Sequence, residues 1–447
     1  MTLIFVVMFT IIFIALSGLT DRQFKQGVLQ SQDELAFQIA EAGLNYGRWR
    51  LAHDGADFTN EVREVEDQFA GVAGSFEVSF EQQPGSTLVM ITSTGTTSNQ
   101  PAREATVKAR YGIPSLARYA LVTNSDVFYA SQVSGEVHAN GGVRMDGTSD
   151  SVVSSAKETY ICQPHHGCNY EEKPGVWGSG EIAELWEYPK PPVDYSAIAL
   201  DLLAIKDAAE DLDTYYGPLP GNSGVGYHIT FNSNNTYSIY RVKTLQPAVY
   251  SWFEEDGSDW VLVSHDINTQ QHIETKAVPS NGVIFVEDTL WIDGAIRDRV
   301  TVAAGAFPDS PSTNVDIILN GNITYGGVRD GSRALGVVAQ RHVLIPWSGA
   351  PNVMTIEGAF LAQKGRFGRR RYNPCCGGNA HNVKSTLNIY GMIGSNLNPA
   401  TAWTSSGTVI SGFQNRNTVY DNNMIYGPPP YFPTSGQYEF ISWEQVE

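Results

Sequence analysis

The chain has little of what usually marks an enzyme or a small disulfide-stapled protein. Its 447 residues include only four cysteines, and 17% of its residues are charged. It contains no HExxH, no GxSxG, no Walker phosphate loop and no dinucleotide-binding glycine fingerprint. These absences argue against the enzyme classes that depend on such motifs. We therefore expect no catalytic residues, no metal and no cofactor.

Basic residues are scarce as well. The 29 lysines and arginines face 47 acidic residues, which gives a formal net charge of −18. A general nucleic-acid-binding surface needs a basic field, so we expect no specific nucleic-acid partner. An acidic exterior of this kind suits a domain exposed to solvent.

Charge is missing altogether from the first twenty residues. Thr2 to Leu19 (TLIFVVMFTIIFIALSGL) is apolar, and Asp21 is the first charged side chain. As a helix these residues would span about 27 Å, roughly the hydrocarbon core of a bilayer. No basic stretch precedes them and no small-residue cleavage site follows, so we do not expect a secretory signal peptide. A plain membrane anchor and a buried core helix are the simpler alternatives.

The pattern that follows predicts that the same helix continues. Apolar residues recur in steps of four and three, which is typical of a helix with one packed face; they are Leu35, Ile39, Ala42, Tyr46 and Trp49. We expect one helix over residues 1–52, apolar all round at 1–19 and on one side at 20–52. Because glycine weakens a helix, we expect unwinding around Ser17 and Gly18 when the chain assembles.

Two segments of this helix resemble type IV pilins. The start MTLIF is similar to a mature pilin N-terminus, and residues 35–44 (LAFQIAEAGL) resemble the PilX-like pilins. One departure is Phe5, which stands where most pilins carry an acidic residue that pairs with a neighbour's terminal amine. Minor or atypical pilins are the members that most often lack this carboxylate.

The resemblance implies a structural subunit of an extracellular cell-surface filament. Such a subunit is a single-pass membrane protein before assembly, is cut by prepilin peptidase, and is polymerised with copies of itself by the pilus assembly machinery. Assembly would rest on the apolar residues Met1, Thr2, Leu3, Ile4, Phe5, Val6, Phe9, Ile12, Phe13 and Leu16. One alternative is a minor or tip pilin that acts as an adhesin on a surface glycan or a neighbouring cell. Another is a membrane-tethered enzyme acting on polysaccharides.

Beyond the helix the sequence predicts an α+β chain that is mostly β. Alternating residues at 75–81, 87–93 and 103–111 predict a small antiparallel, pilin-like β unit over 53–113. From 114 to 447 a seven-residue unit recurs, in which apolar residues alternate up to a glycine and one more follows it, at 131–137, 290–296, 317–323, 354–360 and 387–393. Such recurrence favours a right-handed parallel β-helix over a β-sandwich. Residues 171–279, with a helix over 195–212, are expected to be an insertion, and 427–447 a strap with a closing strand at 438–443 that caps the last coil.

The remaining candidates for chemistry are few. Cys162, Cys168, Cys375 and Cys376 suggest two disulfides, either with Cys162–Cys168 as a closed loop or with bridges between segments. A metal held by Cys162, His165, His166 and Cys168 is the weaker alternative because the spacing fits no standard zinc pattern. Asp293, Asp298 and Asp316 lie near the repeats and are more simply solvated loop residues than an acid–base pair.

A basic run stands out against the acidic background. Arg366, Arg369, Arg370 and Arg371 lie within seven residues of each other, in RFGRRRY. Because a basic loop relieves repulsion between acidic subunits, contact with a neighbouring subunit is one interpretation. A solvated loop and capture of a polyanion are the others.

Overall fold

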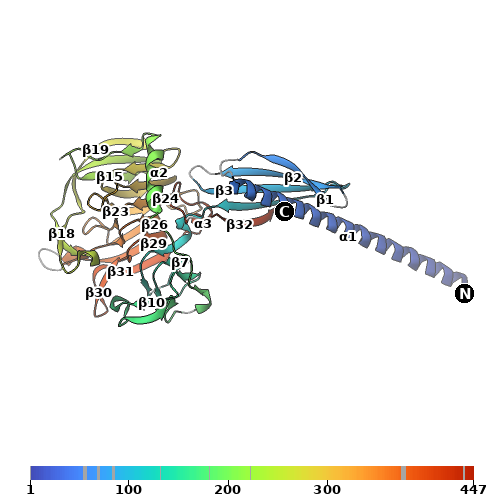
Figure 1. Ribbon diagram of the computed structural model, residues 1–447, viewed down its shortest axis with the longest axis horizontal. Coiled ribbons are helices and arrows are strands. Elements are labelled where there is room, and N and C mark those ends of the chain that lie inside the picture. Colours follow the sequence, from blue (N-terminus) through green and yellow to red (C-terminus); the bar gives the residue numbers. More distant parts are fainter. Residues whose placement is uncertain are drawn as a thin grey trace. The chain divides into compact units, whose positions relative to one another are not determined.

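The computed structural model describes residues 2–53, 58–67, 71–82, 86–130, 132–180, 182–221, 223–373, 379–435 and 438–446. The chain divides into two compact units (Figure 1). The first, here called the N-terminal unit, comprises Met1–Gln83, Leu88–Ile113 and Gln437–Glu447. The second, the large β unit, comprises Pro84–Thr87 and Pro114–Gly436.

One continuous helix, α1 (Thr2–His53), dominates the N-terminal unit. The predicted single long N-terminal helix is therefore confirmed. Its last turn carries Arg50 and His53, and the charge of Arg50 complements the negative end of the helix dipole. The helix is continuous through Ser17 and Gly18 in the single chain, so the predicted unwinding on assembly stays a prediction.

The N-terminal unit also contains a five-stranded antiparallel sheet in the order β1-β2-β3-β4-β32. Its strands are β1 (Glu61–Asp67), β2 (Gly71–Gln82), β3 (Leu88–Thr97), β4 (Glu104–Gly112) and β32 (Glu439–Val446). The three predicted strands correspond to β2, β3 and β4, whereas β1 and β32 were not predicted here.

The assignment of residues 438–443 to a cap on the large domain is wrong. Strand β32 pairs with β4, with Phe440 opposite Tyr111 and Trp443 opposite Ala109. The ring of Phe440 lies 5.2 Å from that of Tyr111, and the ring of Trp443 lies 6.0 Å from that of Phe37 on α1. These aromatic contacts place the C-terminal strand in the N-terminal unit, so the large β unit is an insertion between β4 and β32.

Helix α1 approaches the sheet through small residues. Ala36, Ala40, Gly43 and Gly47 are buried, with Ile39, Leu44 and Leu51 beside them. The predicted packing face is thus only partly right: Ile39 is buried, Leu35 and Tyr46 are half-buried, and Ala42 and Trp49 are exposed. The large apolar residues misled the prediction because a close helix–sheet contact needs small side chains at its centre.

We expect Gly43→Ala to destabilise the N-terminal unit by about 1–3 kcal/mol, the usual cost of overpacking a core. A Cβ at Gly43 would lie 2.2 Å from Oγ of the buried Ser93 and 2.7 Å from the ring of Phe76. Gly27→Ala is the matched control in the same helix, since nothing lies within 4 Å of its Cβ position. That variant should be stabilised by up to about 1 kcal/mol. Denaturant unfolding of both variants in detergent measures the difference, and equal midpoints would contradict the close contact.

The large β unit is mostly β, as predicted, and is built on parallel ladders. One ladder runs β14-β20-β22-β24-β26-β29-β5-β7-β9-β13. Its strands are β14 (Tyr215–Tyr216), β20 (Val283–Val286), β22 (Arg299–Ala304), β24 (Ala334–Ala339), β26 (Val353–Ala362), β29 (Val383–Ser395), β5 (Tyr119–Thr123), β7 (Glu136–Ala139), β9 (Val153–Ser155) and β13 (Trp186–Glu187). Figure 1 shows β26 and β29 between the ends of this unit that carry β15 and β10.

A column of apolar residues in register runs along this ladder. Each residue pairs with the next across neighbouring strands: Ile284, Val302, Val337, Phe360, Ile393, Leu121, Val137, Val153 and Trp186. Because paired residues of neighbouring strands face the same side of a sheet, this column forms the centre of the core. The first strand of the unit, β5, pairs with β29, one of its last.

A second ladder carries the repeated glycine units. It runs from β15 (Gly226–Phe231) through β21 (Leu290–Ala295) and β23 (Ile317–Thr324) to the first halves of β26 and β29, and it ends at β31 (Thr408–Val419). Four repeated units thus lie on β21, β23, β26 and β29, and the fifth begins at Ser131, outside the described residues. Gly358 pairs with Gly391 at φ +148° and +133°, and a Cβ at Gly391 would lie 2.0 Å from the carbonyl oxygen of Gly358. Only glycine fits there.

The expected insertion over 171–279 is only partly separate from the ladders. Strands β13 and β15 fall inside it, yet each pairs with a ladder strand in parallel. The predicted helix is present as α2 (Ile198–Glu210), which buries Ile198, Leu202, Ile205 and Ala209. A long antiparallel pair, β16 (Thr236–Leu245) and β19 (Ile267–Ala277), extends from β15.

Shorter elements complete the large β unit. They are β6 (Val127–Tyr129), β8 (Val143–Met145), β10 (Thr159–Cys162), β11 (Glu171–Pro174), β12 (Val176–Trp177), β17 (Val249–Trp252), β18 (Val261–Val263), β25 (Val343–Leu344), β27 (Phe367–Gly368), β28 (Arg371–Tyr372), β30 (Ala402–Ser405) and α3 (Asn423–Tyr426).

The proline-rich tail lies along a ladder face. The carbonyl of Pro430 accepts a hydrogen bond from Thr301 of β22, and Phe432 is buried. The tail then returns to the start of the unit, where Leu116 N–H donates to Pro433 at 2.8 Å and Ser435 N–H donates to Pro114 at 2.8 Å. The two connections of the inserted unit therefore lie side by side.

Candidate functional site

The N-terminal part of α1, Ile4–Leu19, is here called the apolar segment. Its large apolar side chains are between 52% and 75% exposed. Within the described residues, α1 is the one helix long and apolar enough to cross a membrane, with a mean hydropathy of 2.2 over an 18-residue window that has no buried residue. Exposed apolar surface of this extent marks a membrane or protein contact.

Two threonine hydroxyls, one within the apolar segment and one directly after it, are satisfied inside the helix. Thr10 Oγ1 donates to the carbonyl of Val6 at 2.8 Å, and Thr20 Oγ1 donates to Leu16 and Ser17 at 3.1 and 2.9 Å. An unpaired hydroxyl would cost several kcal/mol in hydrocarbon, so these contacts keep the surface of the segment apolar. Charge begins just beyond it, where Lys25 pairs with Asp21 at 3.1 Å.

The residues predicted to drive assembly are not used by the chain's own fold where the structure describes them. Ile4, Phe5, Val6, Phe9, Ile12, Phe13 and Leu16 are all exposed. Met1 lies outside the described residues, and so do the side chains of Thr2 and Leu3. The role of this set in assembly stays a prediction.

The basic run is not a surface for a partner, and that interpretation is corrected. Arg366, Arg369 and Arg370 are 2%, 0% and 8% exposed. Arg366 Nε donates to Glu255 at 3.0 Å and its Nη2 donates to Glu254 at 3.2 Å. Arg370 donates to Ser251 at 2.7 Å and pairs with Asp256. The acidic turn 254–256 thus neutralises Arg366 and Arg370 within the chain.

The last two arginines behave differently from each other. Among the described residues Arg369 has no carboxylate partner, and it donates instead to the main-chain carbonyls of Pro346, Trp347 and His381. Burial lowers the pKa of this guanidinium, yet an arginine remains charged at neutral pH. Arg371 is half-buried, with its guanidinium 5.3 Å from the ring of Trp260. Arg369 therefore ties three loops together, whereas Arg371 covers one aromatic side chain.

The cysteines and histidines form a structural loop. Cys162 and Cys168 are joined by a disulfide, while Cys375 and Cys376 lie outside the described residues. Because the disulfide joins Cys162 to Cys168, neither thiol is available as a ligand for the metal site considered as an alternative. His166 is 2% exposed, and neither of its ring nitrogens has a hydrogen-bond partner among the described residues. Burial, with the nearby His165 and Arg144, lowers the pKa of His166 to about 4, so this ring is neutral at physiological pH.

The three aspartates near the repeats each have a separate structural partner. Burial opposes the charge of Asp316, but hydrogen bonds from Arg341 hold the pKa of this carboxyl below its ordinary value. Asp293 likewise has a lowered pKa despite burial, because it accepts hydrogen bonds from His228 and Asn320. Asp298 accepts from Asn235 at 3.1 Å. In the described part of the chain, no group of three or more His, Cys, Asp and Glu is placed to hold a metal ion.

Comparison of this chain with known protein families, with curated proteins and with solved structures finds no match.

Proposed function

We propose that this chain is a structural subunit of an extracellular, type IV pilus-like filament that polymerises through its apolar segment. The observation that carries the proposal is an apolar segment whose large side chains are all more than half exposed in the single chain and which is continuous with a helix that packs on an antiparallel sheet. A membrane holds the segment before assembly, and copies of the same segment replace the lipid afterwards.

The continuity of α1 supports assembly over a plain anchor. The same helix is exposed and apolar at Phe5–Leu19 and buried against β3 at Ala40 and Gly43. A membrane anchor needs only a flexible connection to its domain, whereas a filament subunit needs the core helix to fix the position of the displayed domain. Packing between helices without water rests on close contacts and satisfied polar groups, and the internal bonding of Thr10 and Thr20 meets that need.

We propose further that the large β unit is a right-handed parallel β-helix. Support comes from the in-register apolar column and from the paired glycines at 358 and 391. Under this proposal the first coil packs on the last one, and the tail at 427–433 covers a face of the β-helix. The partners are then the membrane, prepilin peptidase, the pilus assembly machinery and further copies of the chain, with the large β unit displayed for attachment.

A second candidate function is that of a minor or tip pilin that acts as an adhesin. Phe5 favours it, because the acidic residue that usually sets the register between pilin helices is replaced by an exposed aromatic. Counting copies separates the two candidates: a tip protein is sparse in the filament, whereas a major subunit makes up its length.

Removal of Met1–Leu19 tests whether this segment drives polymerisation. We expect the shortened chain to be soluble and monomeric, because residues 36–51 still pack on the sheet and the large β unit is untouched. Sedimentation velocity measures the outcome. A shortened chain that still polymerises would show that assembly depends on another surface.

A further inference from the structure

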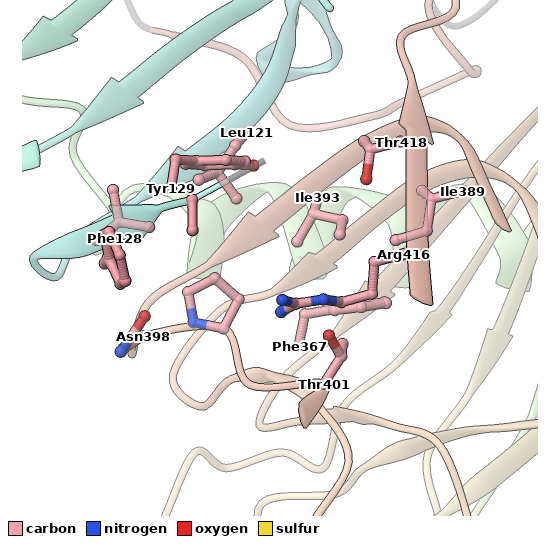
Figure 2. A pocket seen from close by; sticks show the side chains of 13 residues that line it. Leu121, Phe128, Tyr129, Phe367, Ile389, Ile393, Asn398, Thr401, Arg416 and Thr418 are labelled. Atoms are coloured by element: carbon pink, nitrogen blue, oxygen red, sulfur yellow. The ribbon is translucent and has the colours of Figure 1, made fainter. Parts of the chain in front are cut away.

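The cavity shown in Figure 2 offers little room for a ligand. It measures about 100 Å³ and lies in the large β unit, where β29 and β31 meet β5 and β6. Arg416 on its lining is exposed, so the guanidinium is solvated and needs no counter-anion. Ligand pockets usually enclose about 300–1,000 Å³, and a sugar ring does not fit this one.

Two tripeptides of the chain match the acceptor pattern for N-linked sugars, Asn-x-Ser/Thr. They are residues 234–236 (NNT) and 322–324 (NIT). The pattern is short and recurs by chance, so its structural setting decides whether it is modified. An acceptor for these bulky groups has to lie on an exposed surface loop, and the two tripeptides differ in this respect.

The first tripeptide lies at the tip of the hairpin that joins β15 to β16. A hydrogen bond of 2.8 Å from Asn232 N–H to the carbonyl of Thr236 closes the turn. Ser233, Asn234 and Asn235 are all exposed there. Exposed loop tips are the parts of a fold that other enzymes reach most easily, so this tripeptide is accessible in the folded chain.

The hydrogen bonds at this tip leave one asparagine amide nitrogen free. Thr236 Oγ1 donates to Asn234 Oδ1 at 2.7 Å, while Asn234 Nδ2 has no hydrogen-bond partner among the described residues. The other two amides are occupied: Asn232 Nδ2 donates to Thr236 at 2.9 Å, and Asn235 Nδ2 donates to Asp298 at 3.1 Å. Asn234 is thus the asparagine of the tip whose nitrogen is available for a new bond.

The second tripeptide is held inside a ladder. It belongs to β23, where the buried Ile323 pairs with Ile356 of β26. Asn322 Oδ1 accepts a hydrogen bond from the main-chain N–H of Thr355 at 2.9 Å. An enzyme would have to pull this strand from its neighbours to reach the tripeptide, so we expect Asn322 to remain unmodified.

We propose that Asn234 is an N-glycosylation site that receives an oligosaccharide from a lipid diphosphate. In the transfer, a bond forms between Nδ2 of Asn234 and the anomeric carbon of the first sugar. The bond from that carbon to the diphosphate oxygen breaks, the lipid diphosphate leaves with the electron pair, and the amide nitrogen releases one proton. A membrane-bound oligosaccharyltransferase catalyses the step, which needs no oxidant or reductant. The proposal requires that the large β unit is exported but not that the chain polymerises, so it fails separately from filament assembly.

Mass spectrometry of the full chain, purified in detergent from the cells that make it, tests the proposal. Chymotrypsin cuts after aromatic and large aliphatic residues and so releases the peptides 232–237 and 320–325. We expect the first peptide to carry the mass of the attached sugars and the second to be unmodified. Release of the sugars by peptide-N-glycosidase should convert the side-chain amide of Asn234 to a carboxylate.

Three variants show whether the tripeptide directs the modification. Thr236→Val removes the hydroxyl with little change of shape and should abolish the modification, whereas Thr236→Ser keeps the hydroxyl and should retain it. Ser233→Ala, in the same exposed turn but outside the tripeptide, should leave the modification unchanged. An unmodified Asn234 in the unsubstituted chain, sugars on Thr236 or Asn322 in its place, or full modification of Thr236→Val would overturn the proposal.

Discussion

Phe9→Lys is expected to abolish filament formation and to weaken membrane insertion by about 3 kcal/mol, roughly a hundredfold. Phe9 lies near the middle of the apolar segment and is 75% exposed, so its replacement disturbs no contact within the chain. A lysine at the centre of a membrane-spanning helix costs about 2.5–3.5 kcal/mol on insertion scales. In a packed helical core the same charge would be buried without a partner.

Phe24→Lys is the matched control for this substitution. Phe24 is in the same helix and is 73% exposed, but it lies beyond the apolar segment and next to Lys25. We expect this variant to insert in the membrane normally and to retain most of its filaments. Membrane fractionation and counting of surface filaments by electron microscopy measure both effects. Equal behaviour of the two variants would contradict a special role for the apolar segment.

Arg369→Met is expected to destabilise the large β unit by on the order of 3–5 kcal/mol. The substitution keeps a long side chain but leaves the carbonyls of Pro346, Trp347 and His381 without their donor. Each buried acceptor left unpaired costs about 1–3 kcal/mol, and a domain is stable by only about 5–15 kcal/mol.

Arg371→Met, two residues further along the same run, should cost less than about 1 kcal/mol. It removes one cation–π contact with Trp260 at a half-buried position. Denaturant unfolding of the two variants gives the comparison, and similar free energies of unfolding would contradict the structural role of Arg369. Replacement of Arg369–Arg371 with glutamate would remove the bonds of Arg369 as well. A loss of filaments in that variant would therefore report misfolding of the large β unit and not a lost contact between subunits.

Local patterns predicted much of the fold. The absence of charge before Asp21 and the helical recurrence after Leu35 indicated the long helix, because both signals depend on neighbouring residues. The glycine-containing repeats indicated strands β21, β23, β26 and β29, since apolar residues alternate in each unit up to a glycine. At Gly294 and Gly391 the backbone of the neighbouring strand leaves no room for a larger side chain. The closed Cys162–Cys168 loop was one of the alternatives left open, and the structure contains it.

The remaining features depend on contacts distant in sequence. Strand β32 pairs with β4 across more than three hundred residues, and no local pattern indicates which sheet a terminal strand joins. The pairing of β5 with β29 likewise depends on the complete path of the chain. The sequence shows the charges of Arg366 and Arg370 but not the acidic turn 254–256 that neutralises them.

The candidate sites also differ in whether a local pattern of the sequence indicates them. The apolar segment was predictable because its composition alone sets it apart. The role of Arg369 was not, because the fold alone brings the carbonyls of Pro346, Trp347 and His381 to it. In the sequence this arginine is one cation of a basic run that suggests an exposed loop, whereas the structure buries it completely.

Electron cryomicroscopy of the intact protein on its native surface tests the filament proposal most directly. We predict helical polymers in which Phe5–Leu19 from successive copies lie against one another along the central axis, with each large β unit outside. Intact chains that remain dispersed in lipid, with every apolar helix surrounded by acyl chains alone, would contradict it.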